Sequence, residues 1–168
     1  MNNRDYGRRS TAGLVLADWV TLAAILTVVL VVSLPRLHSL ALHQNELDAI
    51  QATRMLGSSV FAMESQPTLS RVLEDDTALE HRLEDVEVLE QGRVLRRHGY
   101  LFDLTHTRDG APALRAWPWN CGETGYGAFV FTPEGGLRGH RNEESRWSGP
   151  GNAPMVPDDD PEWRPVER

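Results

Sequence analysis

Residues 19–34 read WVTLAAILTVVLVVSL and contain no charged residue, glycine or proline. Together with Asp18 and the apolar residues 14–17 upstream, they form a segment of 21 residues, 14–34. A helix of that length can cross about 30 Å of hydrocarbon at about 1.5 Å per residue. The sequence therefore predicts one transmembrane helix over residues 14–35, with membrane lipid as its first partner.

Charge is distributed unevenly on the two sides of this segment. The net charge is −7, but residues 1–13 carry Arg4, Arg8 and Arg9 against Asp5, which leaves +2 before the apolar segment and −9 in the rest. A basic leader (residues 1–13) is typical of a cytoplasmic end. The acidic remainder argues against a nucleic-acid partner, because phosphate binding needs a basic face.

Asp18 is the one acidic residue within the apolar segment. An ionised carboxylate at mid-bilayer costs roughly 2.5–3.5 kcal/mol on insertion scales, so such a residue is by default functional and needs a partner. The alternative is that Asp18, about one turn inside the segment, stays hydrated at the membrane surface.

Three interpretations of this N-terminus compete. A cleaved secretory signal would use Ser39-Leu40-Ala41 as its cleavage site, although the apolar core is slightly too long for such a signal. A twin-arginine export signal would use Arg8-Arg9. The third interpretation, an anchor that is uncleaved or trimmed before the apolar segment, fits the length and charge best.

The same residues resemble the class III signal of type IV pilins and type II secretion pseudopilins. Arg8-Arg9-Ser10-Thr11-Ala12-Gly13 is followed by Leu14-Val15-Leu16-Ala17-Asp18, and counting from Leu14 places Asp18 fifth and Pro35 twenty-second. The family pattern has a glycine that ends a basic leader, an acidic residue at position five and often a proline at position twenty-two. Leu14 and Asp18 stand where the family usually has phenylalanine and glutamate.

This resemblance implies that a prepilin peptidase cuts after Gly13 and methylates the new amine of Leu14. It further implies a single-pass protein of the bacterial cytoplasmic membrane that assembles with other pilin-like subunits through its N-terminal helix. The new α-amino cation of Leu14 could pair with Asp18 of a neighbouring chain and offset the cost of burying it.

Beyond the membrane segment, the spacing of apolar residues predicts that the helix continues over residues 36–66. Pro35 should kink or break it, because proline lacks an N–H and crowds the preceding turn. Apolar residues recur at helical intervals at Leu40, Leu47, Ile50, Ala52, Leu56, Val60 and Met63. His38 and His43 are interpreted as a solvated flank and not as a metal pair.

A second amphipathic helix is predicted after Pro67, with Leu69, Val72, Leu79, Leu83 and Val86 on its apolar side. Its other side is acidic. We interpret that side as a solvated face, because it lacks the ligand pattern of an EF-hand loop. No metal site or cofactor is predicted.

Alternating polarity replaces helical spacing after Gly92. Strands are predicted around residues 100–106, 113–117, 127–131 and 137–141, joined by turns such as Arg108-Asp109-Gly110. The fold class is therefore α+β: a long N-terminal helix, membrane-spanning in its first half, packed on a small four-stranded antiparallel sheet. The motifs His98-Gly99-Tyr100 and Gly122-Glu123-Thr124-Gly125 are weakly similar to heads of pilin-like proteins.

Residues 67–146 are thus expected to form an extracytoplasmic head, and residues 147–168, rich in proline and aspartate, a disordered tail that Trp147 and Trp163 could still dock. No catalytic motif was found, and the lone Cys121 is interpreted as a structural thiol, so no enzyme activity is expected. The expected function is a pilin-like or pseudopilin subunit. The alternative is a single-pass, signal-anchored protein whose extracytoplasmic head binds a ligand or partner.

Overall fold

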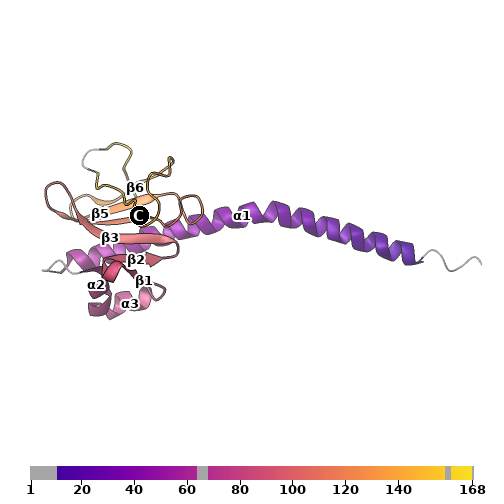
Figure 1. The fold of residues 1–168 in the computed structure, drawn as a ribbon, viewed down its shortest axis with the longest axis horizontal. Coiled ribbons are helices and arrows are strands. Elements are labelled where there is room, and N and C mark those ends of the chain that lie inside the picture. Colours follow the sequence, from indigo (N-terminus) through magenta and orange to yellow (C-terminus); the bar gives the residue numbers. More distant parts are fainter. Residues whose placement is uncertain (1–10, 64–67, 158–159, 168) are drawn as a thin grey trace, which may run out of the picture. The chain divides into compact units, whose positions relative to one another are not determined.

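The computed structural model describes residues 11–63, 68–157 and 160–167, with side chains from residue 17 onward. The chain divides into two compact units, Met1–Leu40 and Ala41–Arg168. The elements in chain order (Figure 1) are α1 (Thr11–Phe61), α2 (Leu69–Asp75), α3 (Thr77–Arg82), β1 (Glu87–Leu89), the short turn η1 (Glu90–Gly92), β2 (Val94–Arg97), β3 (Tyr100–His106), β4 (Pro112–Pro118), β5 (Ala128–Thr132), β6 (Gly136–His140) and β7 (Arg164–Pro165).

In the first unit, α1 continues through Pro35 as a helix, so of the two predicted outcomes, a kink or a break, the break does not occur. Proline removes one backbone donor and costs about 3 kcal/mol inside a helix, but the residues on both sides of Pro35 remain helical. The helix ends at Phe61, before the predicted residue 66. The last of its predicted residues, 64–66, lie outside the described part of the chain.

The segment predicted as one helix after Pro67 forms two short helices. α2 and α3 are separated by Asp76, whose Oδ1 accepts a hydrogen bond from the Leu79 backbone N–H at 3.1 Å. Its Oδ2 accepts a second bond from the Ser59 hydroxyl of α1 at 3.1 Å. Asp76 therefore caps α3 and joins it to α1, which apolar spacing alone does not reveal.

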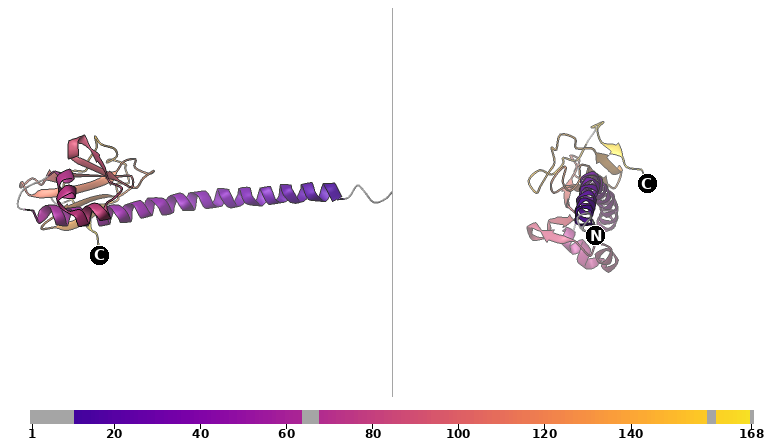
Figure 2. Two further views of the ribbon diagram at one scale, coloured as in Figure 1. Left: turned by 90° about the horizontal axis from the view of Figure 1, so that it is seen from below. Right: turned by 90° about the vertical axis from the view of Figure 1, so that its right-hand side faces the viewer.

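The sheet has seven antiparallel strands in the order β1-β2-β3-β4-β5-β6-β7, not the predicted four. The four predicted strands are confirmed as β3 to β6, and β1, β2 and β7 are additional. β1 and β2 are only three and four residues long and form a hairpin in which Leu89 pairs with Val94. The edges are β1 and β7, and in the right-hand view of Figure 2 the yellow β7 lies away from the pink α2 and α3.

One face of the sheet packs against α2, α3 and the part of α1 that belongs to the second unit. Small α1 residues permit close approach: a Cβ built on Gly57 would lie 2.6 Å from Cδ1 of Phe131. Phe61, one turn later, stacks on the same Phe131 ring with centroids 5.8 Å apart. This core includes Ala49, Ala52, Leu56, Val60, Leu69, Val72, Leu79, Tyr100, Phe102 and Leu114.

The opposite face of the sheet is also buried. Leu101, Trp117 and Val130 project there and are covered by Trp163 and Trp147, with Ala153 and Val156 beside them. Trp163 is 5% exposed, and the next two residues form β7 against β6. Trp147 and Trp163 thus dock residues 147–157 and 160–167 on the head, as their size allowed, because their large apolar side chains complete the second core.

Candidate functional site

The most distinctive surface of the first unit is the apolar part of α1. α1 is long and apolar enough from residue 17 onward to cross a membrane, and none of its most apolar 18-residue window is buried. Thr21 and Thr27 interrupt the apolar surface, but their hydroxyls donate to the carbonyls of Ala17 and Ala23 at 2.9 and 2.8 Å. Such internal hydrogen bonds satisfy polar groups that lipid could not.

The structure places the predicted assembly residues on this helix. Asp18 is exposed beside Trp19, which is 67% exposed, and forms no ion pair among the residues that the structure describes. Pro35 is exposed within the same helix. Gly13 and Leu14, the predicted processing site, belong to α1 but lie outside the described side chains.

Polar residues on α1 attach it to the sheet within the second unit. One carboxylate oxygen of Glu46 accepts hydrogen bonds from the backbone N–H groups of Tyr126 and Gly127, each at 2.9 Å. The Asn45 amide donates to the Thr124 carbonyl at 2.9 Å. These contacts hold residues 124–127 on α1, at positions about 80 residues apart in sequence.

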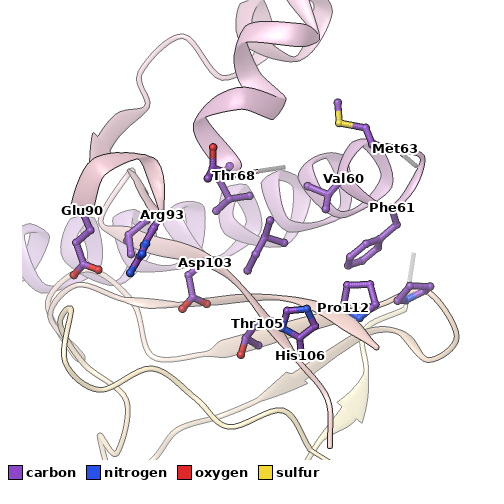
Figure 3. Close-up of a pocket in the computed structure, with 14 residues that line it drawn as sticks. Val60, Phe61, Met63, Thr68, Glu90, Arg93, Asp103, Thr105, His106 and Pro112 are labelled. Atoms are coloured by element: carbon purple, nitrogen blue, oxygen red, sulfur yellow. The ribbon is translucent and has the colours of Figure 1, made fainter. Parts of the chain in front are cut away.

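A cavity of about 640 Å³ lies where α1 ends. Its lining combines apolar side chains with charged ones, and Glu90 and Arg93 lie at one end while Phe61 and Pro112 lie at the other (Figure 3). Asp103 faces it from β3 and is held by Arg115, whose Nε donates to Oδ1 at 2.7 Å. Glu90, which lines the cavity, and the next residue, Gln91, have φ of 48° and 57°, values that residues other than glycine seldom adopt.

A second, more open groove of about 900 Å³ runs along β6 and β7. It contains His140, which packs against both Trp147 and Trp163 with ring centroids 4.8 and 5.5 Å away. The His140 Nε2 lies 2.7 Å from the Glu162 carboxylate. Other charged residues of the groove form exposed ion pairs, Arg141 with Glu143 and Arg146 with Glu144.

Cys121 is half-buried and makes its hydrogen bonds to Asn142 and Ser148. The Asn142 amide nitrogen lies 3.5 Å from the thiol sulfur, and the Cys121 backbone N–H donates to the Ser148 hydroxyl at 3.0 Å. These contacts are those of a loop thiol held by neutral groups. Across residues 11–63, 68–157 and 160–167, no three His, Cys, Asp or Glu side chains are grouped to hold a metal ion.

Sequence reasoning missed the residues that organise the head: Glu46, Asp48, Arg97, Asn142 and His140. Each acts through a partner that is distant in sequence or through a turn whose backbone conformation local spacing does not indicate. Asn142, for example, is 1% exposed and has φ of 52°, and its side chain bonds both the N–H and the C=O of Trp147. No motif distinguishes it from an ordinary loop asparagine.

Comparison with protein-family models, with curated proteins and with solved structures finds no match to this chain.

Proposed function

We propose that this chain is a pilin-like or pseudopilin structural subunit. In this proposal α1 anchors it in the bacterial cytoplasmic membrane, the head is extracytoplasmic, and subunits assemble through α1. The observation that carries the proposal is the composition of α1 itself. Its first part is apolar and exposed, whereas its later part supplies Ala52, Leu56 and Val60 to the core of the head.

The exposed apolar side chains argue for a nonaqueous environment. Leu22, Ile25, Leu26, Val28 and Val29 are each more than 50% exposed. Apolar surface left in water forgoes about 25 cal/mol per Å², so a continuous apolar helix favours lipid or the apolar surface of another chain. An assembly subunit would use both environments in turn, lipid before incorporation and neighbouring helices after it.

Asp18 supports the assembly part of the proposal. A carboxylate on an otherwise apolar helix surface is costly in lipid unless a cation pairs with it. Processing after Gly13 would create such a cation, the α-amino group of Leu14, four residues before Asp18. In a stack of subunits, this amine of one chain would meet the Asp18 of another.

The mature N-terminus provides the direct test, measured by mass spectrometry of the chain from its native membrane. We expect a chain that begins at Leu14 and carries one added methyl group. An intact Met1 would contradict the proposal and support a signal-anchored protein. A start at Leu42 would indicate cleavage after Ala41 and a head released from the membrane, which would contradict both.

The second candidate function is a single-pass membrane protein whose head binds a ligand or partner. The 640 Å³ cavity beside Phe61 and Asp103 is the observation that favours it, because ligand pockets combine apolar walls with a few polar groups. Crosslinking in intact membranes distinguishes the two functions. Contacts between the α1 helices of several chains support the subunit, and a chain that remains monomeric supports the binding protein.

A further inference from the structure

His140 is enclosed by three parts of the head. It ends β6, and its side chain, 9% exposed, packs against Trp147 of the following turn and Trp163 of the C-terminal segment, residues 160–167. The two tryptophan rings also contact each other, with centroids 5.4 Å apart. The imidazole therefore lies at the point where the turn and the C-terminal segment meet.

The hydrogen bonds of His140 require one neutral form of its ring. The backbone N–H of Asn142 donates to Nδ1 at 2.8 Å, so Nδ1 must be unprotonated and the hydrogen must be on Nε2. That hydrogen points to the Glu162 carboxylate, 2.7 Å away. Both ring nitrogens are thus satisfied only while the ring carries a single hydrogen.

A second hydrogen on the ring would disturb this arrangement. It would place an Nδ1–H against the Asn142 N–H, so two donors would face each other inside the protein. Asn142 is 1% exposed and water cannot replace the lost acceptor there. Since the Asn142 side chain holds Trp147 through both of its backbone groups, a movement of Asn142 moves Trp147 as well.

The charged groups around His140 act in both directions. Glu162 favours the protonated ring, but its side chain is 58% exposed, so water weakens that attraction. The pKa of the Glu144 carboxylate is lowered mainly by Arg146, at 2.7 Å, and to a smaller extent by His140. Glu144 therefore favours a positive charge on the His140 ring, and the Arg146 guanidinium opposes it. The other charged groups near the ring, from the turn, the C-terminal segment and α1, are Arg141, Glu143, Asp160, Arg164 and Glu46.

We infer that His140 is a pH-sensitive latch between the turn at residues 142–147 and the C-terminal segment. While the ring carries a single hydrogen, it keeps Trp147 and Trp163 together. A second hydrogen on the ring breaks the Asn142 bond, and the contact opens locally. β7 and the bonds from Arg54 to the carbonyls of Val166 and Glu167 retain the rest of the segment.

The test compares the full chain in detergent micelles at about pH 7.5 and about pH 5, a change that adds protons to histidine rings in general. Hydrogen exchange, corrected for the intrinsic effect of pH, should show that protection of the Asn142 N–H falls about tenfold on acidification, the effect of losing one hydrogen bond. Tryptophan fluorescence should change over the same interval. The change should be smaller in Trp147→Phe, which leaves only Trp163 beside the ring, whereas Trp119→Phe should behave as the parent chain does.

Two histidine variants separate His140 from the other histidines. His140→Gln offers an acceptor and a donor but does not titrate, so it should abolish both pH effects. His81→Gln removes an exposed histidine that pairs with Glu84, and it should preserve them. Unchanged pH effects in His140→Gln would overturn the inference.

Nitrogen NMR of the parent chain provides a test that does not depend on the folding of a variant. We expect a neutral His140 with hydrogen on Nε2 at about pH 7.5 and a change of the Asn142 amide signal as the ring is protonated. A ring with hydrogen on Nδ1, or an Asn142 signal that does not respond to protonation of the ring, would also overturn the latch.

Discussion

Arg97 of β2 holds Asp48 of α1 by two hydrogen bonds, because its Nη1 lies 2.7 Å from one carboxylate oxygen and 2.8 Å from the other. The two side chains are 11% and 23% exposed, and they are 49 residues apart in sequence. This pair joins the helix to the strand hairpin, next to the turn formed by His98 and Gly99. His98 adds a contact to the same carboxylate at 3.1 Å.

Removing either partner of this pair should destabilise the head. Arg97→Ala leaves Asp48 largely buried without its main cation, and we expect a loss of about 1–3 kcal/mol in the free energy of unfolding. Chemical denaturation of the full chain in micelles measures the loss. The matched control is Arg141→Ala, whose side chain is 86% exposed and pairs with Glu143, and a change within about 0.5 kcal/mol is expected there. Equal losses in the two variants would show that burial of the pair does not matter.

Gly57 should not tolerate a side chain. Alanine normally favours a helix over glycine by about 1 kcal/mol, but its Cβ would lie 2.6 Å from the Phe131 ring. Overpacking of this kind costs about 1–3 kcal/mol, so Gly57→Ala should lower the melting temperature. Combining it with Phe131→Leu should recover part of the loss. If Gly57→Ala instead stabilises the head, α1 and β5 must lie farther apart at this contact than in the structure.

Tyr100 should make the head sensitive to alkali. Its side chain is buried, and among the described residues its hydroxyl has no hydrogen-bond partner. Burial, and then the charges of Glu46 and Cys121, raise the pKa of its phenol above the ordinary value. Because ionisation is harder in the folded chain, this contribution to stability is present below about pH 10, where an unfolded tyrosine titrates, and is lost above it.

Tyr100→Phe should therefore reduce the loss of stability above about pH 10 while changing stability near neutral pH little or favourably. Thermal unfolding as a function of pH measures both effects. Tyr126→Phe is the matched control, because Tyr126 is 49% exposed and should leave the alkaline sensitivity in place. A Tyr100 that ionises together with Tyr126 in an ultraviolet titration would contradict the prediction.

Trp163 should be essential to the second core. Truncating a buried tryptophan to alanine costs about 3–5 kcal/mol, so Trp163→Ala should strongly destabilise the head. Met155→Ala is the control from the same part of the chain, since Met155 is 83% exposed and its loss should be near zero. Limited proteolysis should cut the Trp163 variant between residues 147 and 167 faster than the parent chain. Similar behaviour of both variants would mean that Trp163 does not hold the C-terminal segment on the sheet.

Asp18→Ala should abolish incorporation into an assembled polymer if the proposed function is right. The substitution removes the carboxylate that would pair with the amine of a neighbouring chain. Because alanine is apolar, the variant helix should still insert into the membrane. Asp18→Glu keeps the charge and should assemble. Membrane fractionation and crosslinking measure retention and assembly separately, and normal assembly of Asp18→Ala would count against the proposal.

Local patterns were sufficient for the elements whose periodicity is strong. The apolar segment at residues 19–34 required a long helix, and the alternation from Tyr100 to His106 indicated a strand that the structure confirms as β3. The candidate membrane surface could likewise be predicted, because it depends only on the composition of continuous residues. Glycine at residue 110 and at residues 135–136 marked turns between strands for the same local reason.

The tertiary structure decided what local patterns leave open. Arg164 and Pro165 form β7 only because Gly139 and Arg138 of β6 lie beside them, and Trp163 is ordered only because the sheet presents Leu101, Trp117 and Val130. β1 and β2 are too short to show a period. Sequence alone thus determined the long apolar helix and the central strands. The edge strands, the second core and the surroundings of His140 depend on contacts between residues that are distant in sequence. The free energy of such contacts cannot be read from a local pattern.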